Sequence, residues 1–181
     1  MNGFWECLIY LALIGVVFFI IGRILPKEKF SFERFPFYSF PIEKGGKIYQ
    51  RVGVHKWKDS FPDMSRILPF LMPSKKMPKA VTSDQVTLMM QETCVAEWIH
   101  GLLSVLGFGC VFIWKGIGGW IVSLLYALGN IPYIIIQRYN RPKLIQLFEK
   151  LSAREIIPPK IRKEHSHEKS ADTKLQYGRG A

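Results

Sequence analysis

The 181-residue chain has few cysteines and few of the short motifs that announce an enzyme class. Cys7, Cys94 and Cys110 have neither the number nor the spacing of a disulfide framework or a zinc site. All three lie in or near apolar segments, so we expect buried thiols. The sequence also has no phosphate-binding loop, dinucleotide fingerprint or nucleophile elbow. These absences leave it without a motif for nucleotide, zinc or serine-hydrolase chemistry.

Negative charge is scarce, because 14 Asp and Glu face 25 Lys and Arg, for a formal net charge of +11. At the same time, 49% of the residues are hydrophobic, and the cations lie almost wholly outside three apolar segments. This distribution is typical of an integral membrane protein with one electropositive side. A nucleic-acid partner is not expected, since membrane orientation already explains the positive charge.

The three apolar segments cover approximately residues 4–25, 98–114 and 120–136. The first is long enough to span a hydrocarbon core of about 30 Å, and the other two are near the lower limit. Only residues 115–119 separate these two, which predicts a tight helical hairpin; a re-entrant pair is the alternative. The predicted fold class is therefore mainly α: a small integral membrane protein with about three membrane helices, a C-terminal helical hairpin and an irregular aromatic and basic cytoplasmic segment.

The placement of Lys and Arg predicts an orientation in the membrane. Residues 26–97 and the chain after Arg138 are dense in cations, whereas the extreme N-terminus has none. Positive charge favours the cytoplasmic side, so we expect a multi-pass protein of the cell membrane with its N-terminus outside and its C-terminus in the cytoplasm. No basic region precedes the first apolar segment, which favours an uncleaved helix over a secretory signal.

The chain divides into four predicted parts. These are an N-terminal transmembrane helix, a cytoplasmic interfacial segment, a helical hairpin with the candidate active site, and a basic disordered tail, over residues 1–25, 26–83, 84–150 and 151–181. In the second part, residues 48–52 have weak strand character, and four prolines between 62 and 78 forbid long regular structure. Thr82, Ser83 or Asp84 is expected to cap a helix that continues into the second apolar segment.

A polar cluster follows the third apolar segment directly. Its cations and hydrogen-bond donors favour a phosphate or carboxylate site at the bilayer surface. Anchoring to lipid headgroups is the alternative for the two arginines. The cluster also carries helix-ending groups. The candidate substrate-binding residues of this region are Asn130, Gln137, Arg138, Tyr139, Asn140 and Arg141.

If residues 84–114 form one helix, Glu97 and His100 share a face, and Glu92 approximately continues that stripe. A carboxylate beside an imidazole fixes its tautomer and raises its basicity, so these three are the candidate catalytic residues. A structural hydrogen bond from His100 to a neighbouring helix is the alternative. A hairpin with arms of near-equal length should bring this face to the same depth as the polar cluster.

Metal and covalent chemistry have less support from the sequence. Glu97 and His100 match the Glu-x-x-His element of di-iron helix bundles, but the required second copy is missing, so no metal site is expected. His165 and His167 lie in the polar tail and are expected to be solvated. Cys94 is the one plausible nucleophile, yet two helical turns separate it from His100, which favours direct transfer.

Lys56, Trp57 and Lys58 form a third candidate site, suited to a phosphate-bearing or sugar ligand. Together with the Glu92 to His100 motif and the string Gln-Arg-Tyr-Asn-Arg-Pro at 137–142, they resemble the glycosyl-4,4'-diaponeurosporenoate acyltransferase family. That family is known from the last step of staphyloxanthin biosynthesis, a carotenoid pathway. The resemblance covers roughly residues 26–150.

The resemblance implies a membrane enzyme that esterifies a sugar hydroxyl of a glycolipid-like acceptor with a fatty acyl group. Acyl-CoA or acyl-carrier protein is the implied thioester donor, with no further cofactor. In this hypothesis His100, oriented by Glu97 or Glu92, deprotonates the hydroxyl, and the polar cluster stabilises the oxyanion or holds the donor. The alternative from another class is a non-catalytic accessory subunit that binds anionic lipid or a larger membrane partner. The sequence predicts no particular oligomeric state.

Overall fold

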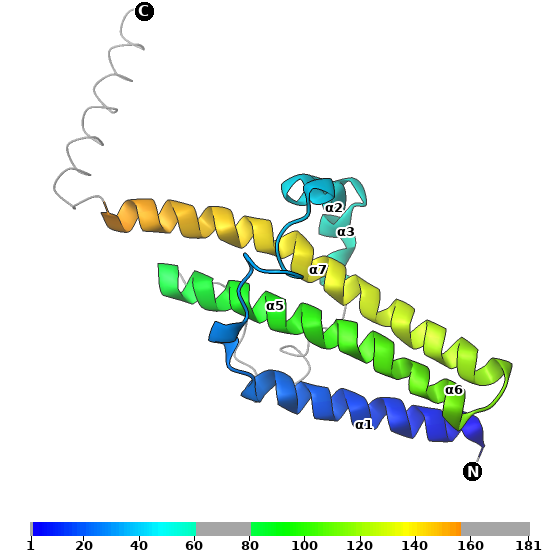
Figure 1. Ribbon diagram of the computed structural model, residues 1–181. Coiled ribbons are helices and arrows are strands. Elements are labelled where there is room, and N and C mark those ends of the chain that lie inside the picture. Colours follow the sequence, from blue (N-terminus) through cyan, green and yellow to red (C-terminus); the bar gives the residue numbers. More distant parts are fainter. Residues whose placement is uncertain (1, 61–80, 157–181) are drawn as a thin grey trace, which may run out of the picture.

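The computed structural model describes residues 2–60 and 81–156 and is dominated by long helices (Figure 1). Three stretches are long and apolar enough to cross a membrane: Gly3–Ile24, Ser83–Ile113 and Ile117–Ala153. The described residues contain no strand. The predicted mainly helical fold with three candidate membrane helices is therefore confirmed. The main elements are α1 (Gly3–Ile24), α5 (Ser83–Leu106), α6 (Cys110–Ile113) and α7 (Ile117–Ile156).

Helix α5 begins where the sequence predicts a cap. Thr82 Oγ1 accepts a hydrogen bond from the backbone N–H of Gln85 at 3.3 Å, and Gln85 Oε1 accepts one from the backbone N–H of Thr82 at 3.2 Å. This capping box satisfies two backbone donors that a helix start leaves free. The helical path then continues through the 3₁₀ turn η4 (Gly107–Gly109) into α6, as expected for the first arm of a hairpin.

The turn between α6 and α7 is tight. Gly116 has a φ of 103°, which a glycine adopts at no steric cost. A Cβ at Gly119 would lie 2.3 Å from the carbonyl oxygen of Trp114, so only a glycine allows this approach of the two arms. Further along, the Ser123 hydroxyl donates to the carbonyl of Gly107 at 3.1 Å. Small residues thus let the helices of the predicted hairpin pack closely.

Helix α7 extends well beyond the third apolar segment. Its 40 residues correspond to about 60 Å, and it passes through both Pro132 and Pro142. The helix therefore continues through the helix-ending groups of the polar cluster. The physical reason is burial, because Leu144 and neighbouring apolar residues of α7 pack against Val86 and Met90 of α5 beyond the cluster. Packing of an apolar face offsets the hydrogen bond and the strain that a proline costs.

Helix α1 packs antiparallel to the arm formed by α5 and α6. Gly3 lies against the Trp114 side chain at one end, and Gly22 lies against Ile99 at the other. Between them, the Tyr10 hydroxyl donates to the carbonyl of Leu106 at 2.8 Å. These contacts set Ile99 level with the end of α1 that the sequence assigns to the cytoplasmic side. The expected buried thiols are confirmed, since the three free cysteines are all buried.

The segment after α1 forms short helices rather than strands. They are η1 (Lys27–Lys29), η2 (Pro41–Gly46), α2 (Lys47–Arg51), α3 (Val54–Trp57) and η3 (Lys58–Ser60). The strand expected at residues 48–52 is wrong. Gly46 and Gly53, with φ of 89° and 71°, flank α2, so the chain turns at both ends of a single helical turn. The four prolines between 62 and 78 and the tail histidines lie outside the described residues.

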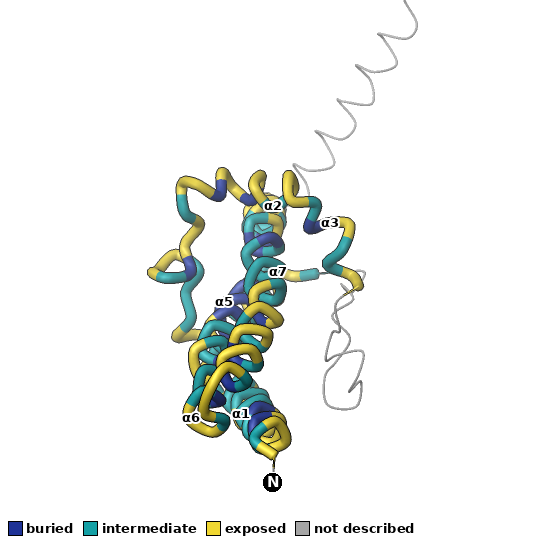
Figure 2. The backbone as a smooth tube through the Cα atoms, turned by 90° about the vertical axis from the view of Figure 1, so that its right-hand side faces the viewer, coloured by how far each residue is buried: buried dark blue, intermediate teal, exposed yellow. Residues whose placement is uncertain are grey.

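The short helices α2 and α3 lie beside α7, on the side away from α5 in the view of Figure 1. In the view turned by 90°, the buried residues follow the interior of the helix bundle, and α2 and α3 stand at its edge (Figure 2). The segment before them, residues 30–40, passes along α5 and α7 and contributes the buried Phe37. It thereby covers the surface where α5 and α7 carry their polar residues.

Candidate active site

Glu97 stands at the centre of a buried ion-pair network. Its Oε1 accepts from Arg138 Nε at 2.7 Å, and its Oε2 accepts from Arg141 Nη2 at 2.6 Å. The two arginines are three positions apart on α7 and therefore share a face. The side chains are 10%, 12% and 5% exposed in that order. The predicted convergence of Glu97 with the polar cluster is what the structure shows.

The network extends to the segment that crosses the two helices. Arg138 Nη1 donates to Glu43 Oε1 at 2.5 Å, and Arg138 Nη2 donates to the carbonyl of Pro36 at 2.6 Å. Arg141 Nη1 donates to the carbonyl of Phe37 at 2.6 Å, and its Nε donates to the Thr93 hydroxyl at 2.9 Å. Two guanidinium groups and two carboxylates balance in charge, which makes their burial tolerable.

Glu43 is the network member that sequence reasoning missed. Burial opposes its ionisation, but hydrogen bonds from Tyr49 and Arg138 outweigh burial and lower the pKa of the Glu43 carboxyl below its ordinary value. Burial and the Glu43 carboxylate together raise the pKa of the Tyr49 hydroxyl. The sequence signal that could have identified Glu43 is its rarity, because it is one of few acidic residues in a strongly basic segment.

His100 lies one helical turn beyond Glu97, with its own set of partners. Its Nδ1 is 2.8 Å from Asn130 Oδ1, and Asn130 Nδ2 donates to the carbonyl of Tyr126 at 2.9 Å. Because the amide oxygen can only accept, Nδ1 donates to it, which in a neutral imidazole leaves the lone pair on Nε2. The imidazole also stacks on the Tyr133 ring, with centroids 4.6 Å apart and planes at 9°.

The sequence predicts a carboxylate partner for His100, but the group at Nδ1 is the side-chain amide of Asn130. Both oxygens of Glu97 accept from arginines, and Glu92 Oε1 accepts from Lys27 Nζ at 2.5 Å. The amide of Asn130 holds the imidazole instead. The sequence analysis placed Asn130 among the substrate-binding residues. Its contact with His100 was not predicted, because the two residues are thirty positions apart. Tyr133 was missed, although its position one turn after Asn130 on the same helix was a usable signal.

The remaining candidates are spread over α7 and the short helices. Tyr139 is 4% exposed, and the Lys143 ammonium lies over its ring at 3.7 Å from the centroid. Gln137 and Asn140 are half-buried on α7. The third candidate site is on α3 and η3, where Lys58 pairs with Asp59 at 3.2 Å. No hydrogen bond or ion pair between described residues joins Lys56, Trp57 or Lys58 to His100 or Glu97.

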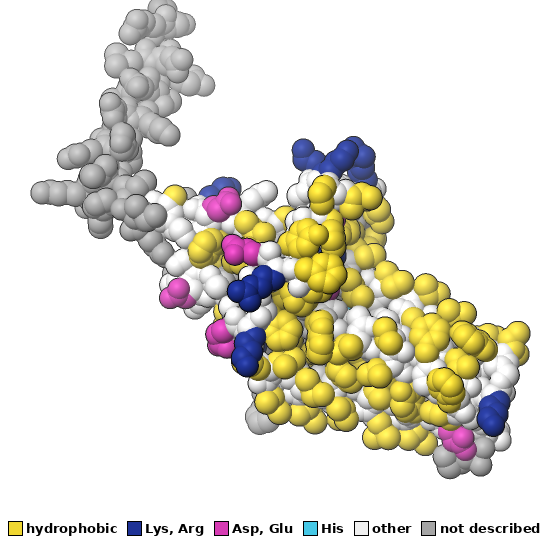
Figure 3. Space-filling model, viewed as in Figure 1, with side chains coloured by type: hydrophobic (Ala, Val, Ile, Leu, Met, Phe, Trp, Pro, Cys, Tyr) yellow, Lys and Arg dark blue, Asp and Glu magenta, His cyan; other side chains and the backbone are white. Residues whose placement is uncertain are grey.

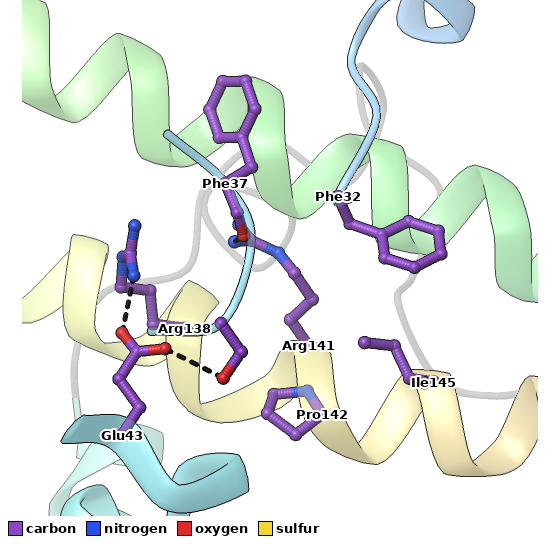
Figure 4. A pocket seen from close by; sticks show the side chains of 8 residues that line it. Phe32, Phe37, Glu43, Arg138, Arg141, Pro142 and Ile145 are labelled. Atoms are coloured by element: carbon purple, nitrogen blue, oxygen red, sulfur yellow. Dashed lines mark hydrogen bonds and ion pairs between the residues drawn. The ribbon is translucent and has the colours of Figure 1, made fainter. Parts of the chain in front are cut away.

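A small cleft opens beside the arginines (Figure 4). Its cavity volume is about 20 Å³, room for roughly one water molecule. The cleft is lined by Phe32, Phe37, Ser39, Glu43, Arg138, Arg141, Pro142 and Ile145. An acyl chain or a sugar does not fit there, and three nitrogens of each arginine already donate to protein groups. The geometry therefore gives both arginines a part in holding the fold together.

The described residues, 2–60 and 81–156, also bear on metal binding. Within these ranges, no group of three or more His, Cys, Asp and Glu is placed to hold a metal ion. The Glu97 and His100 side chains, which share the spacing of a di-iron element, bond to arginines and to an amide. Cys94, the candidate nucleophile, is fully buried.

Comparisons with known proteins place the chain in a family. The sequence model of the glycosyl-4,4'-diaponeurosporenoate acyltransferase family matches residues 30–150. The proteins of that name from Staphylococcus aureus strains bovine RF122 / ET3-1 and N315 are each 31% identical over 153 residues, covering 82% of this chain and 89% of the relative. No solved structure matches. The matched region contains Glu97, His100, Asn130 and both arginines, and the chain belongs to the glycosyl-4,4'-diaponeurosporenoate acyltransferase family.

Proposed function

We propose that this protein transfers a fatty acyl group from an acyl thioester to a sugar hydroxyl of a glycolipid-like acceptor. Membership of an acyltransferase family supports the reaction class, and the relatives' names supply glycosyl-4,4'-diaponeurosporenoate as the acceptor to test first. Three helices of membrane-spanning length and composition suit an acceptor with a long apolar part. The thioester already activates the acyl group, so the reaction requires no further cofactor. Acyl-CoA or acyl-carrier protein is the proposed donor.

The observation that carries the proposal is the His100–Asn130 pair. With its proton fixed on Nδ1, the imidazole directs the lone pair of Nε2 away from Asn130. Nε2 takes the proton of the sugar hydroxyl while the hydroxyl oxygen attacks the thioester carbonyl. The tetrahedral intermediate then collapses, the carbon–sulfur bond breaks, and the leaving thiolate takes the proton back from the imidazolium. The products are the ester and the free thiol, and the base is regenerated.

The depth of His100 suits this chemistry. His100 follows Ile99, which packs against Gly22 near the end of α1, so the imidazole lies close to the limit of the membrane-spanning length. An ionisable residue at that depth is costly unless it is paired or used. There, the sugar of a glycolipid lies in the headgroup layer while its apolar part remains in the bilayer. We place this end of the bundle in the cytoplasm, where acyl thioesters are made and where the surplus of Lys and Arg belongs.

The ion-pair network serves this site by positioning it. His100 is on α5 and Asn130 is on α7, so their 2.8 Å contact depends on the register of the two helices. Glu97 connects α5 to Arg138 and Arg141 of α7 about one turn away. Buried charged groups with several hydrogen bonds tolerate little sliding, because each displaced bond leaves a buried charge uncompensated. We assign the network to holding the catalytic face of α5 against α7.

The experiment that tests the function uses the purified full-length protein in lipid nanodiscs. A labelled long-chain acyl-CoA and glycosyl-4,4'-diaponeurosporenoate are supplied, and the lipid products are analysed by mass spectrometry. The proposal predicts an acceptor heavier by one acyl group, with the label in an ester on the sugar, and an equal amount of free CoA. Acyl-carrier protein carrying the same chain is the second donor. Absence of any ester with both donors would contradict the proposal.

A further inference from the structure

A second groove is lined by residues of η2 and α2, none of which belongs to the ion-pair network. Its cavity volume is about 220 Å³, against about 20 Å³ for the cleft beside the arginines, so it has room for a ligand group and not merely a water. Its lining combines two aliphatic residues with three cations: Ile42, Lys44, Lys47, Ile48 and Arg51.

The positive charge of this groove is uncompensated. No described carboxylate forms an ion pair with Lys44, Lys47 or Arg51. The neighbouring acid, Glu43, is buried and accepts from Arg138 and Tyr49 on the other side of η2. In the space-filling view, Lys and Arg side chains gather over α2 (Figure 3). Three like charges around one hollow repel one another unless an anion binds between them.

The apolar part of the lining points to a lipid. Ile42 is 72% exposed, and Val52, just beyond α2, is 63% exposed. A short basic element with aliphatic side chains beside its cations is the composition of a segment that lies at the headgroup boundary. A soluble anion would use the three cations and gain nothing from the isoleucines. A phospholipid uses both kinds of residue.

The place of the groove in the fold agrees with this chemistry. Figure 1 shows α2 beside α7 at the level where α1 ends. If α1 spans the hydrocarbon core, its ends mark the two headgroup layers, and α2 lies in one of them. Anionic headgroups at that level attract Lys and Arg by about 1 kcal/mol for each cation near the surface.

We propose that the groove formed by η2 and α2 binds the phosphate of an anionic glycerophospholipid. Lys44, Lys47 and Arg51 contact the headgroup phosphate, and Ile42 and Ile48 contact the start of an acyl chain. This site is separate from the catalytic face and does not depend on the reaction proposed above. A bound headgroup would neutralise the cations that follow Glu43 in η2 and α2, and it would thereby favour the conformation of η2 that presents Glu43 to Arg138.

The test is native mass spectrometry of the full-length protein in detergent with equal amounts of phosphatidylglycerol and phosphatidylcholine. Wild-type protein should retain phosphatidylglycerol preferentially. The triple variant Lys44→Gln, Lys47→Gln, Arg51→Gln should lose roughly tenfold or more of that preference. The matched control, Lys29→Gln, Arg34→Gln, Lys150→Gln, removes the same charge from exposed positions elsewhere and should keep it. Equal preference in the triple variant and the control would overturn the proposal.

Two further arms keep the result unambiguous. The single variant Lys47→Gln changes one exposed side chain and should give an intermediate loss of preference without an effect on folding. Free coenzyme A, a soluble phosphate-bearing competitor, should leave the retained phosphatidylglycerol in place. Displacement of the lipid by coenzyme A at equal concentration would assign the groove to a soluble phosphate and would overturn the lipid assignment.

Discussion

At the scale of single residues, the proposed base catalysis depends on the atom that partners the imidazole of His100. An amide oxygen at Nδ1 fixes the tautomer as a carboxylate would, but it adds no negative charge beside the base. Asn130 is itself fixed by its bond to the Tyr126 carbonyl, which determines which side of the amide faces the imidazole. The sequence predicted that His100 lies on the polar face of α5. It did not predict the partner, which depends on the packing of residues thirty positions apart.

Variants of Asn130 separate its two hydrogen bonds. Asn130→Ala removes both, whereas Asn130→Asp keeps an acceptor for Nδ1 and loses the bond to the Tyr126 carbonyl. We expect Asn130→Ala to lower kcat by about 10-fold to 100-fold with little change in KM, because the base loses its orientation. Asn130→Asp should recover a large part of that loss. If Asn130→Asp is no more active than Asn130→Ala, the bond to Tyr126 is the important one, and a positioning role toward His100 is contradicted.

The lowered pKa of Glu43 predicts how the stability of the protein changes at acid pH. The hydrogen bonds that lower the pKa of its carboxyl below the ordinary value of 4.5 exist only in the folded protein. The stabilisation is therefore fully present above the unfolded value and is lost as the pH falls through the lower folded value. Glu43→Gln should be less stable than wild type at neutral pH, and its thermal midpoint should fall less steeply below about pH 4.5. Parallel curves for the two proteins would refute this assignment.

At the scale of elements, apolar runs and caps predicted the long helices, and tertiary packing decided the rest. The capping box at Thr82 is a local signal, and the structure confirms it. The end of α7 is not local, because burial of Leu144 against α5 carries the helix past Pro142. The short helix α2 was predicted as a strand from its side chains, although its conformation follows from the glycines that flank it. Arg138 and Glu43 are 95 positions apart, and no local sequence pattern predicts a contact at that separation.

A substitution of Arg138 tests whether the ion-pair network holds these elements together. Its guanidinium donates to Glu97, Glu43 and the Pro36 carbonyl at once. A lysine ammonium does not reproduce these three hydrogen bonds in that geometry. Arg138→Lys should therefore lower the free energy of unfolding by about 3 kcal/mol, measured by denaturant titration in micelles. The control Arg34→Lys changes an exposed arginine and should stay within about 0.5 kcal/mol of wild type. Equal stability of the two variants would show that the network is not structural.

At the scale of the whole molecule, three long helices and one crossing segment place the polar groups near one end of the membrane-spanning length. Residues 26–60 and the end of α7, which carry most of the described Lys and Arg, lie at that end, while α1 begins at the other (Figure 1). The distribution of charge along the sequence predicted this separation, because Lys and Arg lie almost wholly outside the three apolar segments. Orientation relative to the cytoplasm remains a prediction from the same charges.

Single cysteines test that orientation. Lys115 at the hairpin tip and Lys150 near the end of α7 are both exposed, whereas the three native thiols are buried. In intact cells, a membrane-impermeant maleimide should label Lys115→Cys and should label Lys150→Cys only after the membrane is permeabilised. Wild-type protein is the background control. The reverse pattern would place the catalytic end outside the cell and would contradict a cytoplasmic acyl donor.

The central claim is that His100 is the general base, and acyl transfer by His100→Gln tests it most directly. His55→Gln is the matched control, since His55 is exposed on α3 and outside the ion-pair network. Both variants would be compared with wild type in nanodiscs at equal protein, under single-turnover conditions. Loss of general base catalysis predicts that His100→Gln is slower by about 100-fold or more, while His55→Gln stays within about twofold. A rate for His100→Gln equal to that of the control would contradict the account.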